Sequence, residues 1–428
     1  MASLEKSRHI KYWQRCFTNY LPSACTGNDS TRLTFAFFIV SALDLLSVPL
    51  TPKERSSIRS WVLSLQHPDG GFCGSSSHVL VGQDAAKGSA NLAATFFALL
   101  VLGLAAGTDE EAAAAFAGVE RRKLLRWVKK LQRPDGSFGQ VLWEGEAVGG
   151  HDTRHGYLAS SIRWMLQEEG DGEDDIDAEA LIDHIRHTQT YDGGAAEISD
   201  HESHGMYHIG ISAEIWANRT KAGYAYCAIA ALYMLDRPSS ASAAAHKSEA
   251  VAKGVPDRDA LVRFLVYRQF HYLAKAEEDD SEEDGENYIQ AKLGDLSIGD
   301  ECVHVGYNGR WNKKADTCYC WWVAGTLTMV DSFDAINIPP SRRYLLDITQ
   351  HQIGGFSKYA GGPPDLYHSY LGLAALALLG DADLKEFDAG LCCSEETARK
   401  IELARGGLLR SQDGFDGDGF WESIQNGS

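Results

Sequence analysis

The sequence predicts an all-α protein built from repeated pairs of helices. Three observations lead to this prediction. A glycine-rich turn that follows a glutamine occurs five times, apolar stretches of helical length follow the turns, and no segment shows sustained alternation of apolar and polar residues. Repeated helix pairs bury their apolar faces against neighbouring repeats, so one core can run through the whole chain.

The turn gives the repeat its spacing. Successive copies begin at Gln66, Gln132, Gln189, Gln269 and Gln350, 57 to 81 residues apart. The fourth copy is stretched, because its glycine-rich part returns only at residues 306–310. A degenerate copy is expected at 411–415.

Helices are predicted where the apolar stretches lie. A capping box, Thr51 with Glu54, starts a helix that runs to about Gln66. The longest apolar run, 92–107, is shorter than the ~20 residues of a bilayer span, so we interpret it as a buried core helix. The other apolar helices are predicted at 33–46, 223–235, 316–331 and 366–379.

Two insertions interrupt the repeats. Residues 271–303 contain an acidic run at 277–284, which is typical of a solvated loop. Residues 206–221 separate two halves of what otherwise reads as one motif, either as a real loop or as an error of gene-model splicing. We therefore expect one domain, 1–428, with inserted loops at 206–221 and 271–303.

The composition and net charge restrict the classes of partner and the cellular compartment that we expect. The chain has 428 residues, 44% of them hydrophobic, and a formal net charge of −19. Such a charge disfavours nucleic acid and anionic membranes as general partners. Nine scattered cysteines without a secretory signal indicate reduced thiols in an intracellular, cytoplasmic protein.

The stretch 310–322 carries the strongest chemical signal. Arg310 and Lys313 could bind an anion, and Asp316 and Cys318 with one distant histidine could form a three-ligand zinc site with an open fourth position. Each feature also has a plainer interpretation: Asp316 as a helix cap, Cys318 as a core thiol, and the two cations as a solvated turn.

The motif Gly309-Arg310-x-Asn312-Lys313-x-x-Asp316-x-Cys318-Tyr319-x-x-Trp322 resembles that of protein prenyltransferase β subunits, and most closely those of type I geranylgeranyltransferases. The resemblance extends over nearly the whole chain. It implies an α/α toroid, a barrel of about six helix pairs, wrapped by a helical α subunit in a heterodimer. It also implies transfer of a geranylgeranyl group from its diphosphate to the cysteine of a C-terminal CaaX motif, in substrates such as small GTPases.

The resemblance assigns roles to individual residues. It implies one zinc ion bound by Asp316, Cys318 and His368, and a peptide contact at Arg154. It places the lipid against Trp322. The residues that it implies for the diphosphate are His204, Arg310, Lys313 and Tyr319.

Three positions distinguish members of the family. Thr34 stands where farnesyltransferases carry a bulky tryptophan, and Leu371 where they carry a tyrosine at the end of the lipid pocket. Lys358 replaces an aspartate that helps to hold magnesium in farnesyltransferases. All three indicate a geranylgeranyl enzyme that needs no Mg²⁺.

Some alternatives stay open at this point. The insertion leaves His208 as an alternative to His204. A farnesyltransferase is the nearest rival, and a Rab geranylgeranyltransferase fits Lys358 less well. A terpene cyclase would need an Asp-x-Asp-Asp motif, and we find none in the sequence. A non-catalytic helical scaffold would not need Asp316, Cys318 and His368 together.

Overall fold

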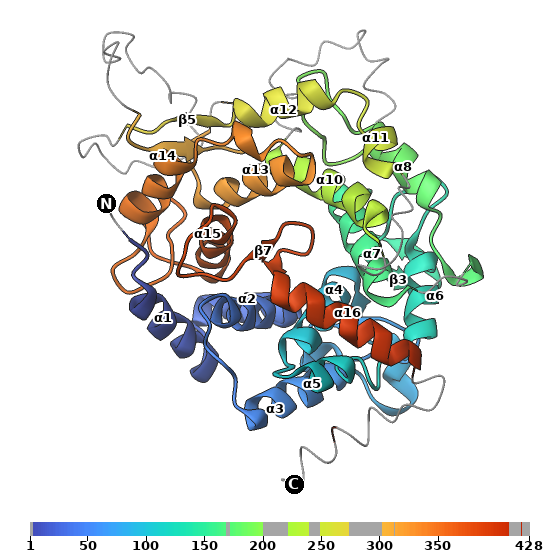
Figure 1. The fold of residues 1–428 in the computed structure, drawn as a ribbon. Helices are drawn as coiled ribbons and strands as arrows, with labels where there is room; N and C mark the ends of the chain where they lie inside the picture. Colours follow the sequence, from blue (N-terminus) through green and yellow to red (C-terminus); the bar gives the residue numbers. More distant parts are fainter. Residues whose placement is uncertain are drawn as a thin grey trace.

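The structure is two concentric rings of helices (Figure 1). It is a computed structural model that describes residues 3–167, 172–199, 221–238, 249–273, 302–311, 313–410 and 421. Each inner helix packs against the next, and the last packs against the first, which closes the ring. The inner helices are α2 (Arg32–Leu45), α4 (Leu92–Leu104), α7 (Thr153–Leu166), α10 (Ala222–Asp236), α13 (Thr317–Met329) and α15 (Leu366–Leu378).

Shorter and more polar helices form the outer ring (Figure 1). They are α1 (Lys6–Thr18), α3 (Pro52–Leu63), α6 (Arg121–Leu131), α8 (Ala178–Arg186), α12 (Arg258–Val266) and α14 (Ile338–Arg343), which continues as a π-helical turn, Tyr344–Thr349. Two short helices, α5 (Asp109–Ala113) and α11 (Ala250–Gly254), lie in the connections. The predicted all-α toroid is therefore confirmed.

The predicted helices agree with the observed ones to within a few residues at each end. The predicted capping box is present, because Thr51 accepts a hydrogen bond from the Glu54 amide and the Glu54 carboxylate accepts one from the Thr51 amide. No described helix is long and apolar enough to cross a membrane. All nine cysteines are free thiols in the structure. The sixth turn at 411–415 and most of both insertions, 206–221 and 271–303, lie outside the described residues.

The strands are short antiparallel pairs between helices. They pair β1 (Phe72–Cys73) with β2 (Ala90–Asn91), β3 (Val141–Trp143) with β4 (Glu146–Val148), β5 (Gln269–His271) with β6 (Val305–Tyr307), and β7 (Phe387–Asp388) with β8 (Cys393–Ser394).

The glutamine turns share one backbone pairing. In the first turn Gln66 pairs with Phe72, six residues on, and the turns at Gln132, Gln189 and Gln350 repeat this spacing. In the fourth turn Gln269 pairs with Tyr307 instead, across the long insertion. The stretched fourth copy is thus confirmed, because its two halves meet in space as the other turns do.

The glutamine side chains link neighbouring repeats. Each carboxamide donates to one backbone carbonyl and accepts from one backbone amide just before the next outer helix. Gln132, for example, bonds the carbonyl and the amide of Asp177. Gln350 makes the same pair of bonds to Ser3 and Glu5, at the start of the chain. These hydrogen bonds join the last repeat to the first and so close the ring.

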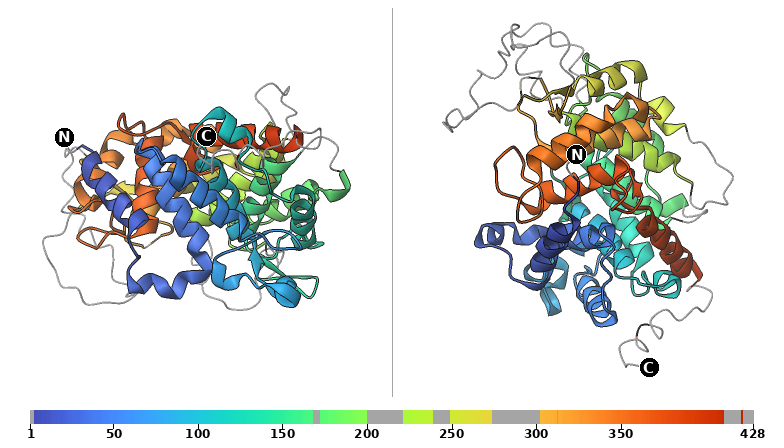
Figure 2. Two further views of the ribbon diagram at one scale, coloured as in Figure 1. Left: turned by 90° about the horizontal axis from the view of Figure 1, so that it is seen from below. Right: turned by 60° about the vertical axis from the view of Figure 1, so that its left-hand side comes forward.

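One end of the ring is covered by α16 (Glu395–Arg410), as the side view in Figure 2 shows. The segment 387–394, which precedes α16, reaches the inner helices. Its backbone carbonyls accept hydrogen bonds from buried tyrosine hydroxyls on three of these helices: Tyr157, Tyr226 and Tyr370. This segment therefore forms a floor for the centre of the ring.

Candidate metal centre and anion-binding loop

Three possible metal ligands meet at the start of two neighbouring inner helices, α13 and α15. One ligand atom each from Asp316, Cys318 and His368 lie within 4.8 Å of one another. His368 Nε2 is 3.3 Å from Asp316 Oδ1. All three residues are buried or nearly so, with Cys318 at 5% and His368 at 9% exposure.

Helix capping explains the positions of Asp316 and Cys318. Asp316 is the N-cap of α13, and its carboxylate accepts a hydrogen bond from the Cys318 amide at 2.9 Å. Aspartate is among the preferred residues at this position. Its backbone is fixed as well, because the Asp316 amide bonds the Tyr307 carbonyl and the Thr317 amide bonds the Lys358 carbonyl. The plain interpretation of Asp316 as a helix cap is therefore correct, and it is compatible with metal binding through the remaining oxygen lone pairs.

His368 is held by a second capping residue. Asp365 is the N-cap of α15 and accepts hydrogen bonds from the His368 amide at 2.8 Å and from His368 Nδ1 at 2.6 Å. The bond to Nδ1 leaves Nε2 directed at Asp316. A carboxylate behind a histidine ligand is a common arrangement in metal sites, because it fixes the tautomer and the ring orientation.

The protonation equilibria of this cluster are strongly coupled. Burial alone would lower the pKa of His368, but hydrogen bonds to Asp316 and Asp365 raise it to about 9. Burial alone would raise the pKa of Asp316, but hydrogen bonds from His368 and Cys318 produce a net lowering. Burial raises the pKa of the Cys318 thiol well above its usual range, and the Asp316 carboxylate raises it further. A bound metal would displace the protons of Cys318 and His368.

The donor set fits zinc. Sulfur, imidazole nitrogen and carboxylate oxygen are the usual zinc ligands, and bonds of ~2.0–2.3 Å in a tetrahedron bring ligand atoms about 3.3–3.8 Å apart. His368 Nε2 and Asp316 Oδ1 are already at this distance, and all three ligand atoms lie within 4.8 Å of one another, so a contraction of the cluster would complete a site with three protein ligands. Magnesium, which prefers oxygen ligands, is a poor match for a thiolate.

Lys358 lies beside this cluster. Its ammonium is 3.9 Å from the second carboxylate oxygen of Asp316, and its side chain is 56% exposed. The predicted lysine is thus next to the candidate metal ligands and open to a bound substrate.

The cation pair lies on the loop that leads into α13. A Cβ added to Gly309 would come within 2.1 Å of the Tyr319 ring, so only glycine allows this close approach. Arg310 follows directly, and its charge acts on Tyr319, although burial still dominates and raises the Tyr319 pKa. Lys313, another predicted diphosphate residue, lies on the same loop. His204 and its alternative His208 lie outside the described residues, as does Asn312 of the motif.

Aromatic side chains line the inner ring without a break. Neighbouring ring centroids are 4.9 to 6.2 Å apart along this series. The last link is a 3.2 Å hydrogen bond from Trp322 Nε1 to the Tyr367 hydroxyl. The series runs Tyr367, Phe38, Phe97, Phe96, Tyr157, Tyr226 and Trp322, and draws on all six inner helices. These side chains therefore form one continuous series of contacts around the inner ring.

The predicted lipid residues belong to these helices. Thr34 is half-buried in the first turn of α2, and Leu371 is buried on the adjacent α15. Trp322 is half-buried on α13 and contacts Tyr226. The predicted peptide residue, Arg154, lies in the first turn of α7 and forms an ion pair with the N-cap Asp152.

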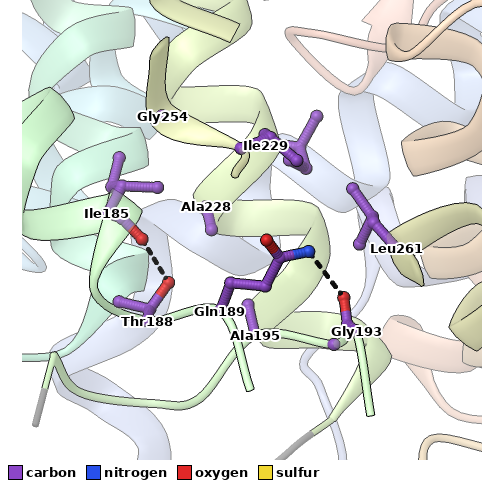
Figure 3. A pocket seen from close by; sticks show the side chains of 11 residues that line it. Ile185, Thr188, Gln189, Gly193, Ala195, Ala228, Ile229, Gly254 and Leu261 are labelled. Carbon is purple, nitrogen blue, oxygen red and sulfur yellow. Dashed lines mark hydrogen bonds between the residues drawn. The ribbon is translucent and has the colours of Figure 1, made fainter. Parts of the chain in front are cut away.

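A small cavity elsewhere in the molecule does not compete with this site. It lies between α8, α10 and α12 and is lined by residues of the third turn, including Gln189 and Gly193 (Figure 3). Its volume of about 20 Å³ holds about one water molecule.

Comparisons with known proteins agree with this architecture. Residues 4–217 and 206–393 match the family described as "Prenyltransferase alpha-alpha toroid domain". The chain belongs to this family. It is 30% identical to the geranylgeranyl transferase type-1 subunit beta of Arabidopsis thaliana, over 90% of this chain and 87% of the relative.

Two further similarities are to a geranylgeranyltransferase and to a farnesyltransferase. A structure of Candida albicans protein geranylgeranyltransferase-I complexed with GGPP superposes with a TM-score of 0.71 at 25% identity, covering 94% of this chain and 99% of the other. The protein farnesyltransferase subunit beta of Schizosaccharomyces pombe is 26% identical, over 88% of this chain and 79% of the relative. The predicted resemblance to prenyltransferase β subunits is therefore confirmed.

Two contributors to the site were not predicted. Asp365, which orients His368, is signalled in the sequence by its spacing as an N-cap three residues before the histidine. Tyr367, which joins Trp322 to Cys318 through its hydroxyl, carries no signal of its own, because its partners come from a helix 45 residues away.

Proposed function

We propose that this chain is the catalytic β subunit of a type I protein geranylgeranyltransferase. The observation that carries the proposal is that the starts of α13 and α15 bring three metal ligands together, beside a cation-bearing loop and next to the aromatic residues of the inner helices. The chemistry that joins these parts is alkylation of a protein thiol by an isoprenoid diphosphate.

The proposed metal is zinc, held by Asp316, Cys318 and His368, with the fourth position left for the cysteine of a CaaX protein substrate. Zinc bound there would lower the pKa of the coordinated thiol and so supply the thiolate nucleophile. Asp365 keeps His368 in the tautomer that offers Nε2.

The chain's own cations are proposed to act on the leaving group. Negative charge grows on the diphosphate as its C–O bond breaks, and fixed donors that meet this charge lower the barrier. Arg310, Lys313 and Tyr319 lie on one loop and helix start, and the exposed ammonium of Lys358 lies 3.9 Å from Asp316. We propose that the Lys358 ammonium takes over the electrostatic role that Mg²⁺ has in farnesyltransferases. His204 remains part of the proposal on the strength of the family motif alone.

Three positions favour geranylgeranyl over farnesyl diphosphate. Thr34 leaves more room than tryptophan in the first turn of α2, Leu371 is smaller than tyrosine, and Lys358 is not a carboxylate that could hold magnesium. We further propose a helical α subunit as the partner and the cytoplasm as the place of action, with Arg154 near the end of the bound peptide.

The deciding experiment is a parallel transfer assay with the α and β subunits co-expressed. Farnesyl and geranylgeranyl diphosphate compete for a peptide that ends in CaaX, with Mg²⁺ chelated and zinc retained. We expect preferential transfer of the geranylgeranyl group. Preferential farnesyl transfer would refute the lipid assignment, and absence of transfer with either diphosphate would refute the enzyme.

A further inference from the structure

Arg268 breaks the rule that the other turns follow. The residue before each turn's glutamine is buried, and in the other four turns it is a leucine or a threonine: Leu65, Leu131, Thr188 and Thr349. In the fourth turn this position holds Arg268, which is 0% exposed. Burying a cation is costly unless something compensates it, so the exception requires a reason.

Among the described residues, hydrogen bonds do not compensate the buried charge of Arg268. None of the three guanidinium nitrogens of Arg268 has a hydrogen-bond partner in the part of the chain that the structure describes. Burial lowers the pKa of Arg268 to about 10, and the carboxylate of Asp192 partly opposes this. The side chain therefore still carries its charge at neutral pH.

Two aromatic rings surround the guanidinium instead. Its central carbon lies 4.8 Å from the ring centroid of Phe264 and 4.4 Å from that of Trp311. Phe264 is buried in α12, whereas Trp311 is 53% exposed and covers the guanidinium from the outside. Trp311 stands between Arg310 and Lys313, at a position that the prenyltransferase motif leaves open.

The backbone around Trp311 is fixed at both sides. We call residues 308–311 and 313 the anion loop. The Asn308 amide donates to the Arg268 carbonyl at 3.2 Å, and the Asn308 side chain donates to the Lys313 carbonyl at 3.1 Å. The Gly309 carbonyl accepts from the Ala222 amide at the start of α10. The contact of the exposed Trp311 ring with the Arg268 guanidinium adds to these hydrogen bonds.

We propose that Arg268 and Trp311 are a positioning pair, which holds the anion loop so that Arg310 and Lys313 keep the spacing that receives a diphosphate. This inference rests on the proposed function. Two like charges three residues apart repel each other, so a free loop would spread them and lose order. A stacked pair sets their separation before the ligand arrives, which lowers the entropic cost of binding.

The test measures binding of inorganic pyrophosphate and of geranylgeranyl diphosphate to the α–β complex by calorimetry. Trp311→Ala should raise both Kd values roughly twofold to thirtyfold, the range that one cation–π contact covers. In steady state kcat/KM for the diphosphate should fall by at least the same factor, because Arg310 and Lys313 are also proposed to meet the charge of the leaving group, while zinc content stays unchanged. Trp311→Phe, which keeps a ring over the guanidinium, should restore most of the affinity.

The chain offers a matched control in Tyr267. Its ring is 57% exposed and lies 5.9 Å from that of Trp311, but it does not stack on Arg268 in the described contacts. Tyr267→Ala should leave both Kd values unchanged. An equal loss in Tyr267→Ala and Trp311→Ala would mean that this surface acts by another route, such as a subunit contact, and would overturn the proposal.

Arg268→Leu separates positioning from stability. Two other turns carry leucine at this position, so the variant should fold with unchanged or higher thermal stability and still bind pyrophosphate more weakly. Combined with Trp311→Ala, it should cause no further loss of affinity, because both changes remove the same contact between Arg268 and Trp311.

The outcomes separate a failure of the proposed function from a failure of the positioning pair. If the unchanged complex fails to bind pyrophosphate, the proposed function itself is wrong. If it binds, but Trp311→Ala and Arg268→Leu bind equally well, Arg268 is only structural and the positioning pair is refuted.

Discussion

The first and fourth turns have the same backbone and different chemistry. In the first, Gln66 pairs with Phe72, and the helix that follows is capped by Asn91, whose side chain accepts from the Ala94 amide. In the fourth, Gln269 pairs with Tyr307, and the following helix is capped by Asp316. Both caps stabilise a helix start, but only the second has a thiol two residues on and a histidine beside it.

This comparison shows how a site can be added to a repeat at little structural cost. An N-cap position already favours Asp, Asn, Ser or Thr, so a metal-binding carboxylate there does not disturb the fold. The neighbouring turn contributes in the same way, because Asp365 caps α15 and also orients His368. The proposed chemistry therefore lies at helix starts, while the glutamine turns carry the architecture.

The largest change is expected at Lys358, which follows the fifth turn and lies beside Asp316. Without its ammonium, the growing charge of the leaving group loses one fixed cation. Lys358→Asp should lower the transfer rate ~10²–10³-fold with Mg²⁺ chelated, the usual effect of losing one electrostatic donor, and the rate should recover as Mg²⁺ is added. If the unchanged enzyme stops when Mg²⁺ alone is removed, Lys358 does not replace the ion.

A smaller effect is expected at Asp365. Asp365→Asn keeps the helix cap but weakens the bond to His368 Nδ1. Zinc affinity, measured by competition with a chromogenic chelator, should fall ~10–100-fold, as is typical for such outer partners. Asn91→Asp in the first turn is the control, since no metal ligand adjoins it in the described structure. Unchanged zinc affinity in Asp365→Asn would contradict the orienting role.

Thr34→Trp tests the lipid side of the ring. A bulky ring in the first turn of α2 should exclude the last isoprene unit, and each methylene buried there is worth ~0.8 kcal/mol. We expect competition between the two diphosphates to shift about tenfold or more towards farnesyl. An unchanged ratio would show that Thr34 does not border the lipid.

The smallest effects are expected in the turns themselves. Gln350→Leu removes the hydrogen bonds to Ser3 and Glu5, and Gln66→Leu removes those to Gly118 and Glu120. Each should lower the free energy of unfolding by about 1 kcal/mol, because the bonds are largely exposed, and neither should change zinc content. A loss of zinc in Gln66→Leu would mean that architecture and site are not separable.

Much of the fold was predictable because its signals are local. The glutamine turns, the Thr51–Glu54 capping box and the apolar helices are all patterns within about a dozen residues, and the structure confirms them. Helix ends differ by one to three residues, because apolar runs such as 92–107 continue beyond the last helical hydrogen bond of α4.

The site was less accessible to sequence reasoning. Motif matching found Asp316, Cys318 and His368, which the structure brings together. It could not find Tyr367 or the stack of Trp311 on Arg268, because these contacts join residues about 45 apart in the sequence that meet only in the folded chain. Arg268 could have been noticed in the sequence as the single charged residue at its repeat position.

The most direct test of the account compares two cysteines of one helix. Cys318 and Cys320 are both buried in α13, but only Cys318 belongs to the ligand cluster. Elemental analysis of the purified α–β complex should give one zinc per β subunit for the unchanged protein and for Cys320→Ala. Cys318→Ala should lose most of the metal and most of the turnover while keeping its thermal stability. Full zinc content in Cys318→Ala would contradict the central claim that Asp316, Cys318 and His368 hold the metal at the starts of α13 and α15.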